Sequence, residues 1–362
     1  MKVLALSSYP VEAAATRFRI AQYIEPLREV GIEIELKPFL DSNRFSSLYS
    51  SGNRISKALS LLPPLAQRLE LLSASDYDAV FIQREAMLLG PPVFEWFLSS
   101  FKKIPMILDL DDATYVPYES PSFGRLGSIF KTFWKTDALI SRAEVVICGN
   151  QYIADHVESK GKRAVVISTT VDSRIFKPIP KYDRTPVIGW IGTHSTFPLL
   201  EKIFPAIQKV AESHRFVLRI AGSGKSQVSI PGVEVELLDW NMDREPYDFA
   251  DMDIGLYPLS VIPNASVEWL AGKSGFKAIQ YLAVGIPFVM TPIGVCATIG
   301  RDGITHFNAN NPDDWRQHLA TLLSDHELRT KMGAAGRSLF LEEYNQSLNI
   351  DALRKLFREL GA

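Results

Sequence analysis

Short apolar runs of strand length alternate along this chain with longer segments of helical character, and the series occurs twice. The first series comprises residues 3–8, 32–39, 79–83, 105–110, 145–149 and 164–168, and the second comprises 187–192, 216–222, 233–238, 253–259 and 287–291. Strands separated by helices are the pattern of a parallel α/β sheet. The sequence therefore predicts two Rossmann-like, doubly wound parallel-sheet domains that face each other across a cleft, because the ligand loops of such sheets follow the strand ends.

The boundary between the two series lies at residues 171–186, which carry three prolines and four basic residues without an apolar period. Such a segment is typical of an interdomain linker. We expect an N-terminal domain over residues 1–170 and a C-terminal domain over 171–340. A last helix is expected beyond Gly336, with residues 341–362 able to return to the N-terminal domain.

Composition excludes several classes of protein. The formal charge of −2 is far from the basic excess of most nucleic-acid-binding chains, so no nucleic-acid partner is expected. The two cysteines, Cys148 and Cys296, are too few for a disulfide framework and favour a reducing, cytoplasmic setting. The start of the chain is too weakly apolar for a secretory signal, and prolines interrupt the uncharged stretch 281–300. We therefore expect no membrane-spanning helix.

Two Gly-Lys-Ser tripeptides, at 224–226 and 272–274, invite comparison with a phosphate-binding P-loop. The motif requires another glycine five residues before the Gly-Lys pair, and these positions hold Arg219 and Val267. Nucleoside triphosphate hydrolysis is therefore not expected.

The apolar run 105–110 is followed by an acidic cluster, in which Asp109 and Asp111 share one face of the strand and Asp112 lies on the other. Carboxylates at a strand end can bind Mg²⁺, which makes a metal-dependent phosphotransferase or hydrolase using Asp109 and Asp111 one hypothesis. Aspartates that cap the next helix are a second, and carboxylates that act on a substrate in the cleft are a third.

The segment 253–309 contains the strongest indication of ligand binding. A strand and an irregular loop precede Gly272-Lys273-Ser274-Gly275, which opens a predicted helix. Amide groups at a helix start favour anions. Lys273 and Lys277 are four residues apart, so we expect both on one helical face, where they could meet a diphosphate. The alternative is two solvated surface lysines.

The second half of the chain also resembles the family 4 retaining glycosyltransferases, group 1 glycosyltransferases with the two-domain GT-B fold. The motifs that carry the resemblance are Val171-Asp172 with Phe176 and Pro178, the strand at 253–259, the run 280–287, Asp302-Gly303 and the helices after Asp313. The first half resembles the family more loosely. The resemblance implies metal-independent, retaining transfer of a sugar from a nucleoside-diphosphate sugar, with no further cofactor, to a glycan or lipid-linked saccharide, as in cell-surface polysaccharide or lipopolysaccharide synthesis.

The residues differ from the family pattern at three places. The family's two glutamates, eight residues apart, correspond to Gly272 and Gln280, and its fourth-strand histidine corresponds to Asp111. Gly192-Thr193-His194-Ser195 replaces a basic pair. These departures motivate a further alternative, a non-catalytic module that only binds sugar nucleotides.

The resemblance assigns the N-terminal domain to the acceptor and the C-terminal domain to the donor. The predicted catalytic residues are Asp111, Asp112 and Lys273, and no metal ligands are predicted. The predicted donor-binding residues are Lys277, Ser274, Gly275, Gln280, Thr193, His194, Gly222, Asp239 and Trp240. On the acceptor side we expect Arg84, Glu85 and Arg17, which is favoured over Arg19 of the same loop.

One segment raises the question of a membrane. Residues 122–142 interleave aromatic residues with basic ones, which is the composition of an amphipathic helix on an anionic membrane surface. A peripheral contact with the inner face of a membrane would suit a lipid-linked acceptor. The alternative is a core helix whose lysines extend to solvent.

Overall fold

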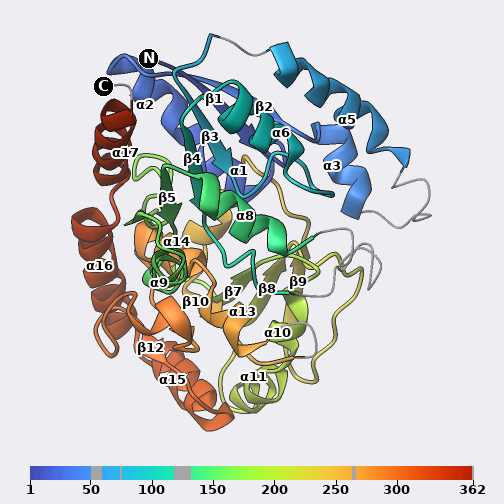
Figure 1. The fold of residues 1–362 in the computed structure, drawn as a ribbon. Helices are drawn as coiled ribbons and strands as arrows, with labels where there is room; N and C mark the ends of the chain where they lie inside the picture. Colours follow the sequence, from blue (N-terminus) through green and yellow to red (C-terminus); the bar gives the residue numbers. More distant parts are fainter. Residues whose placement is uncertain (50–58, 74–75, 118–131, 263–265, 361–362) are drawn as a thin grey trace. The chain divides into compact units, whose positions relative to one another are not determined.

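The computed structural model describes the chain except residues 50–58, 74–75, 118–131, 263–265 and 361–362 (Figure 1). The backbone divides into two compact units. Unit 1 comprises Met1–Thr169, Gly272–Ser274 and Ser347–Ala362, and unit 2 comprises Thr170–Ala271 and Gly275–Gln346. The tripeptide Gly272–Ser274 therefore belongs to unit 1, although both of its neighbours in sequence belong to unit 2.

Unit 1 is built on a six-stranded sheet in the order β2-β1-β3-β4-β5-β6. Its strands are β1 (Lys2–Ser7), β2 (Glu33–Pro38), β3 (Ala79–Gln83), β4 (Met106–Leu110), β5 (Val145–Cys148) and β6 (Ala164–Val166), and neighbouring strands pair in parallel. The chain reverses its direction across the sheet between β1 and β3. Ligands of open α/β sheets bind beyond the strand ends at such a point.

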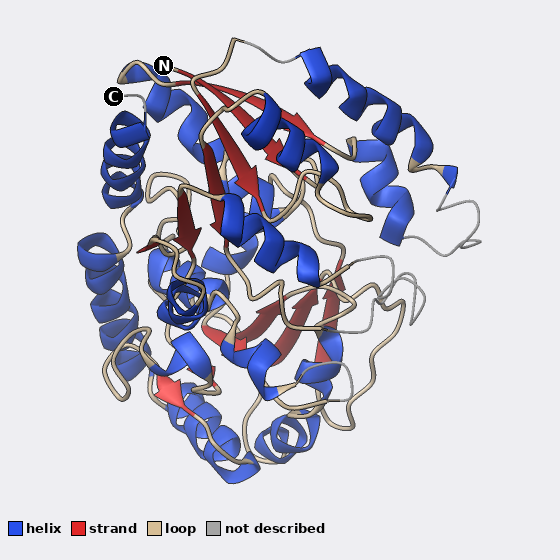
Figure 2. Ribbon diagram, viewed as in Figure 1, coloured by secondary structure: helices blue, strands red, loops and turns tan. Residues whose placement is uncertain are grey.

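Helices cover both faces of this sheet (Figure 2). They are α1 (Ala14–Arg19), α2 (Ile24–Glu29), α3 (Ser42–Tyr49), α5 (Leu62–Arg68), α6 (Val93–Trp96), α8 (Trp134–Arg142), α9 (Gln151–Ser159) and α17 (Gln346–Leu360), with shorter turns at Ala21–Tyr23, Leu69–Ser73 and Phe97–Phe101. Alternate residues of β1, β3, β4 and β5 enter two separate cores. Leu353, Leu356 and Phe357 of α17 complete the core that contains Val3 and Phe81.

Unit 2 contains a second six-stranded parallel sheet, in the order β12-β11-β10-β7-β8-β9. Its strands are β7 (Val187–Ile191), β8 (Val217–Ala221), β9 (Glu234–Leu238), β10 (Ile254–Tyr257), β11 (Phe288–Met290) and β12 (Phe307–Asn308). Its helices are α10 (Phe197–Glu201), α11 (Phe204–Ala211), α12 (Glu245–Ala250), α13 (Val267–Ala271), α14 (Phe276–Val284), α15 (Pro312–Ser324) and α16 (His326–Glu343), with a turn at Gly294–Ala297. The predicted fold class, two Rossmann-like parallel sheets, is confirmed.

The end of the chain forms two helices. Gly336 lies inside α16, and the last helix expected beyond it is α17. A Cβ at Gly333 would approach the carbonyl oxygen of Gly285 to 2.1 Å, and one at Gly336 would lie 3.0 Å from Leu282. These glycines allow α16 to pack directly on α14 and its C-terminal cap, which explains glycine at positions where it costs helix stability.

The segment proposed for a membrane contact is described only in part, because residues 118–131 lie outside the described residues. Its remainder forms α8, in which Trp134 is exposed and Lys135 is buried. The Lys135 ammonium contacts the Glu85 carboxylate at 2.5 Å and donates to the Met87 carbonyl at 3.0 Å. Lys135 is thus an internal cation rather than part of a basic surface. Among the described residues, no helix has the length and hydropathy needed to cross a membrane.

The α17 helix should contribute strongly to the stability of unit 1. Phe357 is fully buried, and its ring meets that of Phe81 edge-on at 5.8 Å. Phe357→Ala should lower the free energy of unfolding of unit 1 by about 3–5 kcal/mol because it leaves a cavity. Leu348→Ala, on the exposed side of the same helix, should change it by no more than about 0.5 kcal/mol. Hydrogen exchange of β1 and β3 amides in increasing urea measures both; equal losses would contradict the packing described.

Candidate active site

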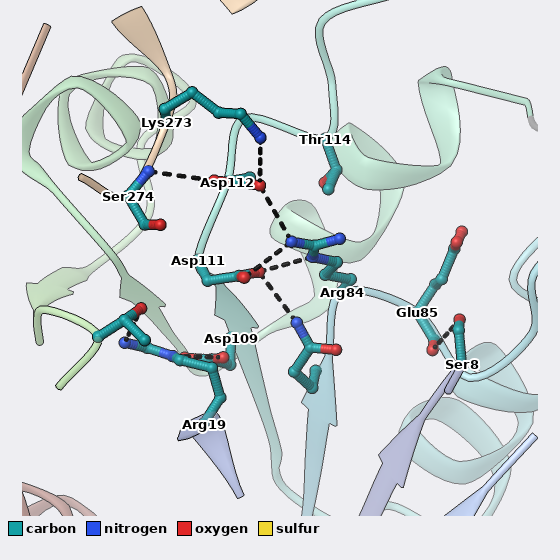
Figure 3. A network of polar contacts seen from close by, with 12 residues as sticks. Ser8, Arg19, Arg84, Glu85, Asp109, Asp111, Asp112, Thr114, Lys273 and Ser274 are labelled. Carbon is teal, nitrogen blue, oxygen red and sulfur yellow. Dashed lines mark hydrogen bonds and ion pairs between the residues drawn. The ribbon is translucent and has the colours of Figure 1, made fainter. Parts of the chain in front are cut away.

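Three aspartates at the carboxyl end of β4 each face a cation, and together they form the polar network drawn in Figure 3. Asp109 is the most enclosed. The Arg19 guanidinium of α1 contacts both of its oxygens and donates through Nη1 to the carbonyl of Ile167 at 2.6 Å. Both side chains are buried. Asp109 is therefore held in an internal ion pair.

Asp111 lies beyond the end of β4, and its carboxylate accepts hydrogen bonds from two consecutive residues at the end of β3. The guanidinium of Arg84 donates from Nε to Oδ1 at 2.6 Å and from Nη2 to Oδ2 at 2.7 Å. Gln83 adds a hydrogen bond from Nε2 to Oδ1 at 3.0 Å. Arg84 has a φ of 63°, a left-handed conformation that is uncommon outside glycine and clusters at functional sites. The bidentate contact fixes the orientation of the carboxylate.

Asp112 binds the segment that precedes α14. Its Oδ2 accepts hydrogen bonds from the ammonium of Lys273 at 2.9 Å and from Nη2 of Arg84 at 3.2 Å, while its Oδ1 accepts from the amide of Ser274 at 3.1 Å (Figure 3). Burial alone would raise the pKa of this carboxyl group, but the charges of Lys273 and Arg84 and these hydrogen bonds lower it to about 2. Asp112 is therefore ionised at neutral pH.

The backbone of residues 272–274 is fixed by two further contacts within unit 1. The amide of Ala113 donates to the carbonyl of Gly272 at 3.0 Å, and Nδ2 of Asn150 donates to the carbonyl of Lys273 at 2.9 Å. A Cβ at position 272 would lie 2.2 Å from the Cβ of Ala113. Glycine is therefore the only residue that fits this approach without rearrangement, which explains why no glutamate occupies the position.

The two lysines do not share a helical face as predicted. α14 begins at Phe276, after Gly275 with a left-handed φ of 66°, so Lys273 lies outside the helix. Lys273 contacts Asp112, whereas the ammonium of Lys277 lies 5.6 Å from the centre of the Tyr257 ring. A Cβ at Gly275 would collide with Ile299 at 2.2 Å. This glycine turn separates the directions of the two side chains.

Gln280 is not presented to a ligand. It is buried in α14, and its Nε2 donates to Oε1 of Glu245, a buried residue of α12, at 3.2 Å. The predicted contact with a ribose hydroxyl would require this hydrogen bond to be exchanged. In this structure Gln280 links two helices of unit 2.

Several predicted donor residues of unit 2 do come together, at the carboxyl ends of β7, β8 and β9. Gly222 has a φ of 76°, and a Cβ there would meet the carbonyl oxygen of Gly192 at 2.3 Å and Cβ of Trp240 at 3.2 Å. A Cβ at Gly224 would lie 3.5 Å from that of His194. Thr193 lies next to His194 in the sequence, and the exposed Asp239 lies next to Trp240. The cluster lies next to the switch point of the sheet, between β7 and β10.

The predicted acceptor residues have different environments. Arg84 joins the carboxylate network, as described. Glu85 pairs with Lys135 and accepts a hydrogen bond from Ser8 at its carbonyl. Arg17 donates weakly to the carbonyl of Glu12 at 3.4 Å and stacks its guanidinium 4.5 Å from the Phe18 ring.

Sequence reasoning did not place Gln83, Lys135 or Asn150 at the site, and it favoured Arg17 over Arg19. Their signals were present but weak. Gln83 ends a buried strand, where a polar residue is uncommon, and Asn150 is the side-chain N-cap of α9. Arg19 follows Arg17 by two residues, and nothing in the sequence shows which of the two turns inward.

Comparison with known proteins identifies part of the chain. Residues 185–325 match the family model described as glycosyl transferases group 1. This segment is of the group 1 glycosyltransferase type. It contains the unit 2 cluster, the 272–275 segment and α14. An uncharacterized glycosyltransferase from Methanocaldococcus jannaschii is 24% identical over 231 residues; the alignment covers 61% of this chain and spans 61% of the length of that protein.

Solved structures resemble the whole chain. Sucrose-phosphate synthase from Thermosynechococcus elongatus has a TM-score of 0.67 at 12% identity, covering 99% of each chain. HepE from Anabaena, determined in complex with UDP-glucose, has a TM-score of 0.66 at 14% identity, covering 99% of this chain and 98% of its own. These neighbours share the GT-B fold, which confirms the expected fold class.

The contact between positions 272 and 113 can be tested by a compensating substitution. Gly272→Ala should destabilise unit 1 by about 1–3 kcal/mol, because the new methyl group overlaps Ala113. Ala113→Gly in the same chain should recover part of this loss, although Ala113→Gly alone should destabilise the protein. Thermal unfolding of the four proteins gives the cycle; strictly additive losses would show that the two positions do not touch.

The low pKa of Asp112 predicts a pH dependence of stability. The folded value is about 2 and the unfolded value is about 3.9, so the ionised group stabilises the protein above pH 4 and this contribution is lost as the pH falls through 2. Asp112→Asn removes the titrating group. The difference in melting temperature between wild type and this variant should therefore shrink from pH 4 to pH 2. A difference that stays constant over this range would contradict the assigned ion pair.

Proposed function

We propose that this protein is a retaining glycosyltransferase that moves a sugar from a nucleoside-diphosphate sugar to a saccharide or lipid-linked saccharide. The observation that carries the proposal is the convergence of the Lys273 ammonium and the Ser274 amide on a single anionic group. Lys273 and Ser274 lie within the segment of group 1 type. Two donors of this kind can equally neutralise the diphosphate that leaves during sugar transfer, where electrostatic stabilisation is usually most effective.

The nucleotide would bind at the strand ends of unit 2. Thr193, His194, Gly222, Asp239 and Trp240 border this region, where the left-handed turn at Gly222 brings the backbone close to Gly192. Lys277 and the amide of Gly275 would also bind the donor. Since HepE was determined with UDP-glucose, UDP-sugars are the first donors to test.

The carboxylates of unit 1 would act on the sugar. Asp111 is oriented by the Arg84 guanidinium, so it can accept a hydroxyl hydrogen bond or stabilise positive charge that develops at the anomeric carbon. Glu85, Arg84 and Arg17 would contribute to the acceptor side. A lipid-linked acceptor would require contact with a membrane surface, for which exposed Trp134 is a candidate residue, and a cytoplasmic location suits the two buried cysteine thiols.

A metal-dependent phosphotransferase is less well supported. Its proposed ligands, Asp109 and Asp111, direct their oxygens at Arg19 and Arg84. Within the described residues, no group of three or more His, Cys, Asp or Glu side chains is arranged to hold a metal ion. Because guanidinium groups already pair with the carboxylates that would bind the metal, we favour the transferase over a metal-dependent enzyme.

A non-catalytic sugar-nucleotide-binding module is the second candidate. It is favoured by Gly272, which offers no side chain to the sugar, and by the buried position of Gln280. Binding of a nucleotide sugar without turnover on any acceptor would identify this function.

The transferase predicts a specific loss on Lys273→Ala. Removal of one charge-stabilising donor should lower kcat/KM by about 100- to 1,000-fold. Lys202→Ala, which removes an exposed lysine of unit 2, should leave kcat/KM unchanged. Product formation from UDP-sugars and a panel of oligosaccharides measures both, and NMR of the new linkage shows whether the anomeric configuration is retained.

The same assay separates the alternatives. Turnover should be unaffected by a chelator such as EDTA. Abolition by the chelator with recovery on adding Mg²⁺ would refute the metal-independent mechanism, and inversion of the anomeric configuration would refute retention.

A further inference from the structure

The carboxylate of Asp112 is bound as a ligand phosphate would be. One oxygen accepts from the Lys273 ammonium at 2.9 Å and the other from the Ser274 backbone amide at 3.1 Å. An ammonium and a backbone amide on adjacent residues are the donors from which anion sites are commonly built. We infer that Asp112 is a built-in competitor that occupies the diphosphate position of the ligand-free protein and is displaced when the donor binds. The inference rests on the proposed function.

The donors are held in place independently of Asp112. Hydrogen bonds from Ala113 and Asn150 to the carbonyls of Gly272 and Lys273 fix the backbone of the segment. The close approach of Gly272 to Ala113 adds a steric constraint. The Ser274 amide therefore keeps its direction when the carboxylate leaves, and it remains available to another anion.

A ligand can reach the position that the Asp112 carboxylate occupies beside Lys273. The side chains of Asp112 and Lys273 are 23% and 20% exposed, in contrast to 1% for Asp109. Asp112 also has a second cation to receive it, because the same Oδ2 that binds Lys273 accepts from Nη2 of Arg84 at 3.2 Å. A diphosphate can take Lys273 and Ser274 while Asp112 stays paired with Arg84, so no carboxylate is left without a partner. This exchange would avoid the large penalty of an unpaired buried charge.

The shared oxygen also links donor binding to the sugar-side carboxylate. Nη2 of Arg84 donates to both Asp112 and Asp111. When Asp112 leaves Lys273, its attraction for Arg84 strengthens, and the hold of Arg84 on Asp111 changes. The environment of Asp111 would therefore change when the diphosphate of a donor binds.

A purely structural role for Asp112 makes the opposite prediction. If its task were only to fasten the 272–274 segment, its loss would loosen the segment and weaken diphosphate binding. If it competes, its loss removes the competitor and strengthens binding. The sign of the change in Kd therefore distinguishes the two roles.

The experiment is a double-mutant cycle on binding of UDP, GDP, ADP and dTDP, measured by calorimetry on the full chain. Asp112→Asn keeps the shape of the side chain but removes its charge, and it should lower the Kd of the diphosphate that binds best by about tenfold. In a Lys273→Ala background the same change should alter the Kd by less than about twofold, because the competition for Lys273 is gone.

Asp137→Asn is the matched control. Asp137 pairs with Lys160 at 2.7 Å and with His156 at 2.8 Å, so its loss changes the net charge equally without touching Lys273. It should leave the Kd unchanged. If Asp112→Asn lowers the melting temperature by more than a few degrees, Asp112→Ser provides the second comparison.

The outcomes separate the inference from the function on which it rests. Weaker or equal binding by Asp112→Asn, or an equal gain in the Lys273→Ala background, would overturn the inference while the wild type still binds a diphosphate. Failure of all four diphosphates to bind both wild type and Asp112→Asn would overturn the proposed function and the inference together.

Discussion

The pairing of each β4 carboxylate with its own cation is the interaction on which the candidate site depends. Arg19, Arg84 and Lys273 come from α1, from the turn after β3 and from the segment before α14, yet all meet aspartates within four residues. Three partly or fully buried carboxylates so close together would otherwise repel one another and lose hydration. The pairs thus hold together the elements that contribute them, and the near-neutral charge of the whole chain conceals this local polarity.

Position 272 shows how packing limits the chemistry of the site. The backbone after β4 approaches Gly272 so closely that even a methyl group would overlap Ala113. The resemblance to retaining glycosyltransferases places a sugar-contacting glutamate here, and this chain replaces it with a backbone contact. Position 272 therefore offers only backbone groups, whereas the side chains of Asp111 and Arg84 are held in a fixed geometry.

The sequence was sufficient to predict both sheets, because buried parallel strands are continuous apolar runs that need no tertiary information to be recognised. β12 escaped detection since two residues carry no periodicity. Lys273 and Lys277 point in different directions because Gly275, between them, adopts a left-handed turn. Ile299 leaves no room for a Cβ at this position, and the spacing of the two lysines in the sequence gives no sign of the turn.

The three aspartates are of one residue type but differ in how deeply their side chains are buried. This difference decides which of them could act on a substrate. Alternation along the strand predicts one face for Asp109 and Asp111, but the surroundings of the two side chains differ. Asp109 is 1% exposed and sealed by Arg19, Asp111 is 8% exposed and braced by Gln83 and Arg84, and Asp112 is 23% exposed and shared between two cations. Since exchange of partners needs both access and an alternative cation, only Asp112 has the features of a movable group. Asp111 is instead held in one orientation by two hydrogen bonds from one guanidinium.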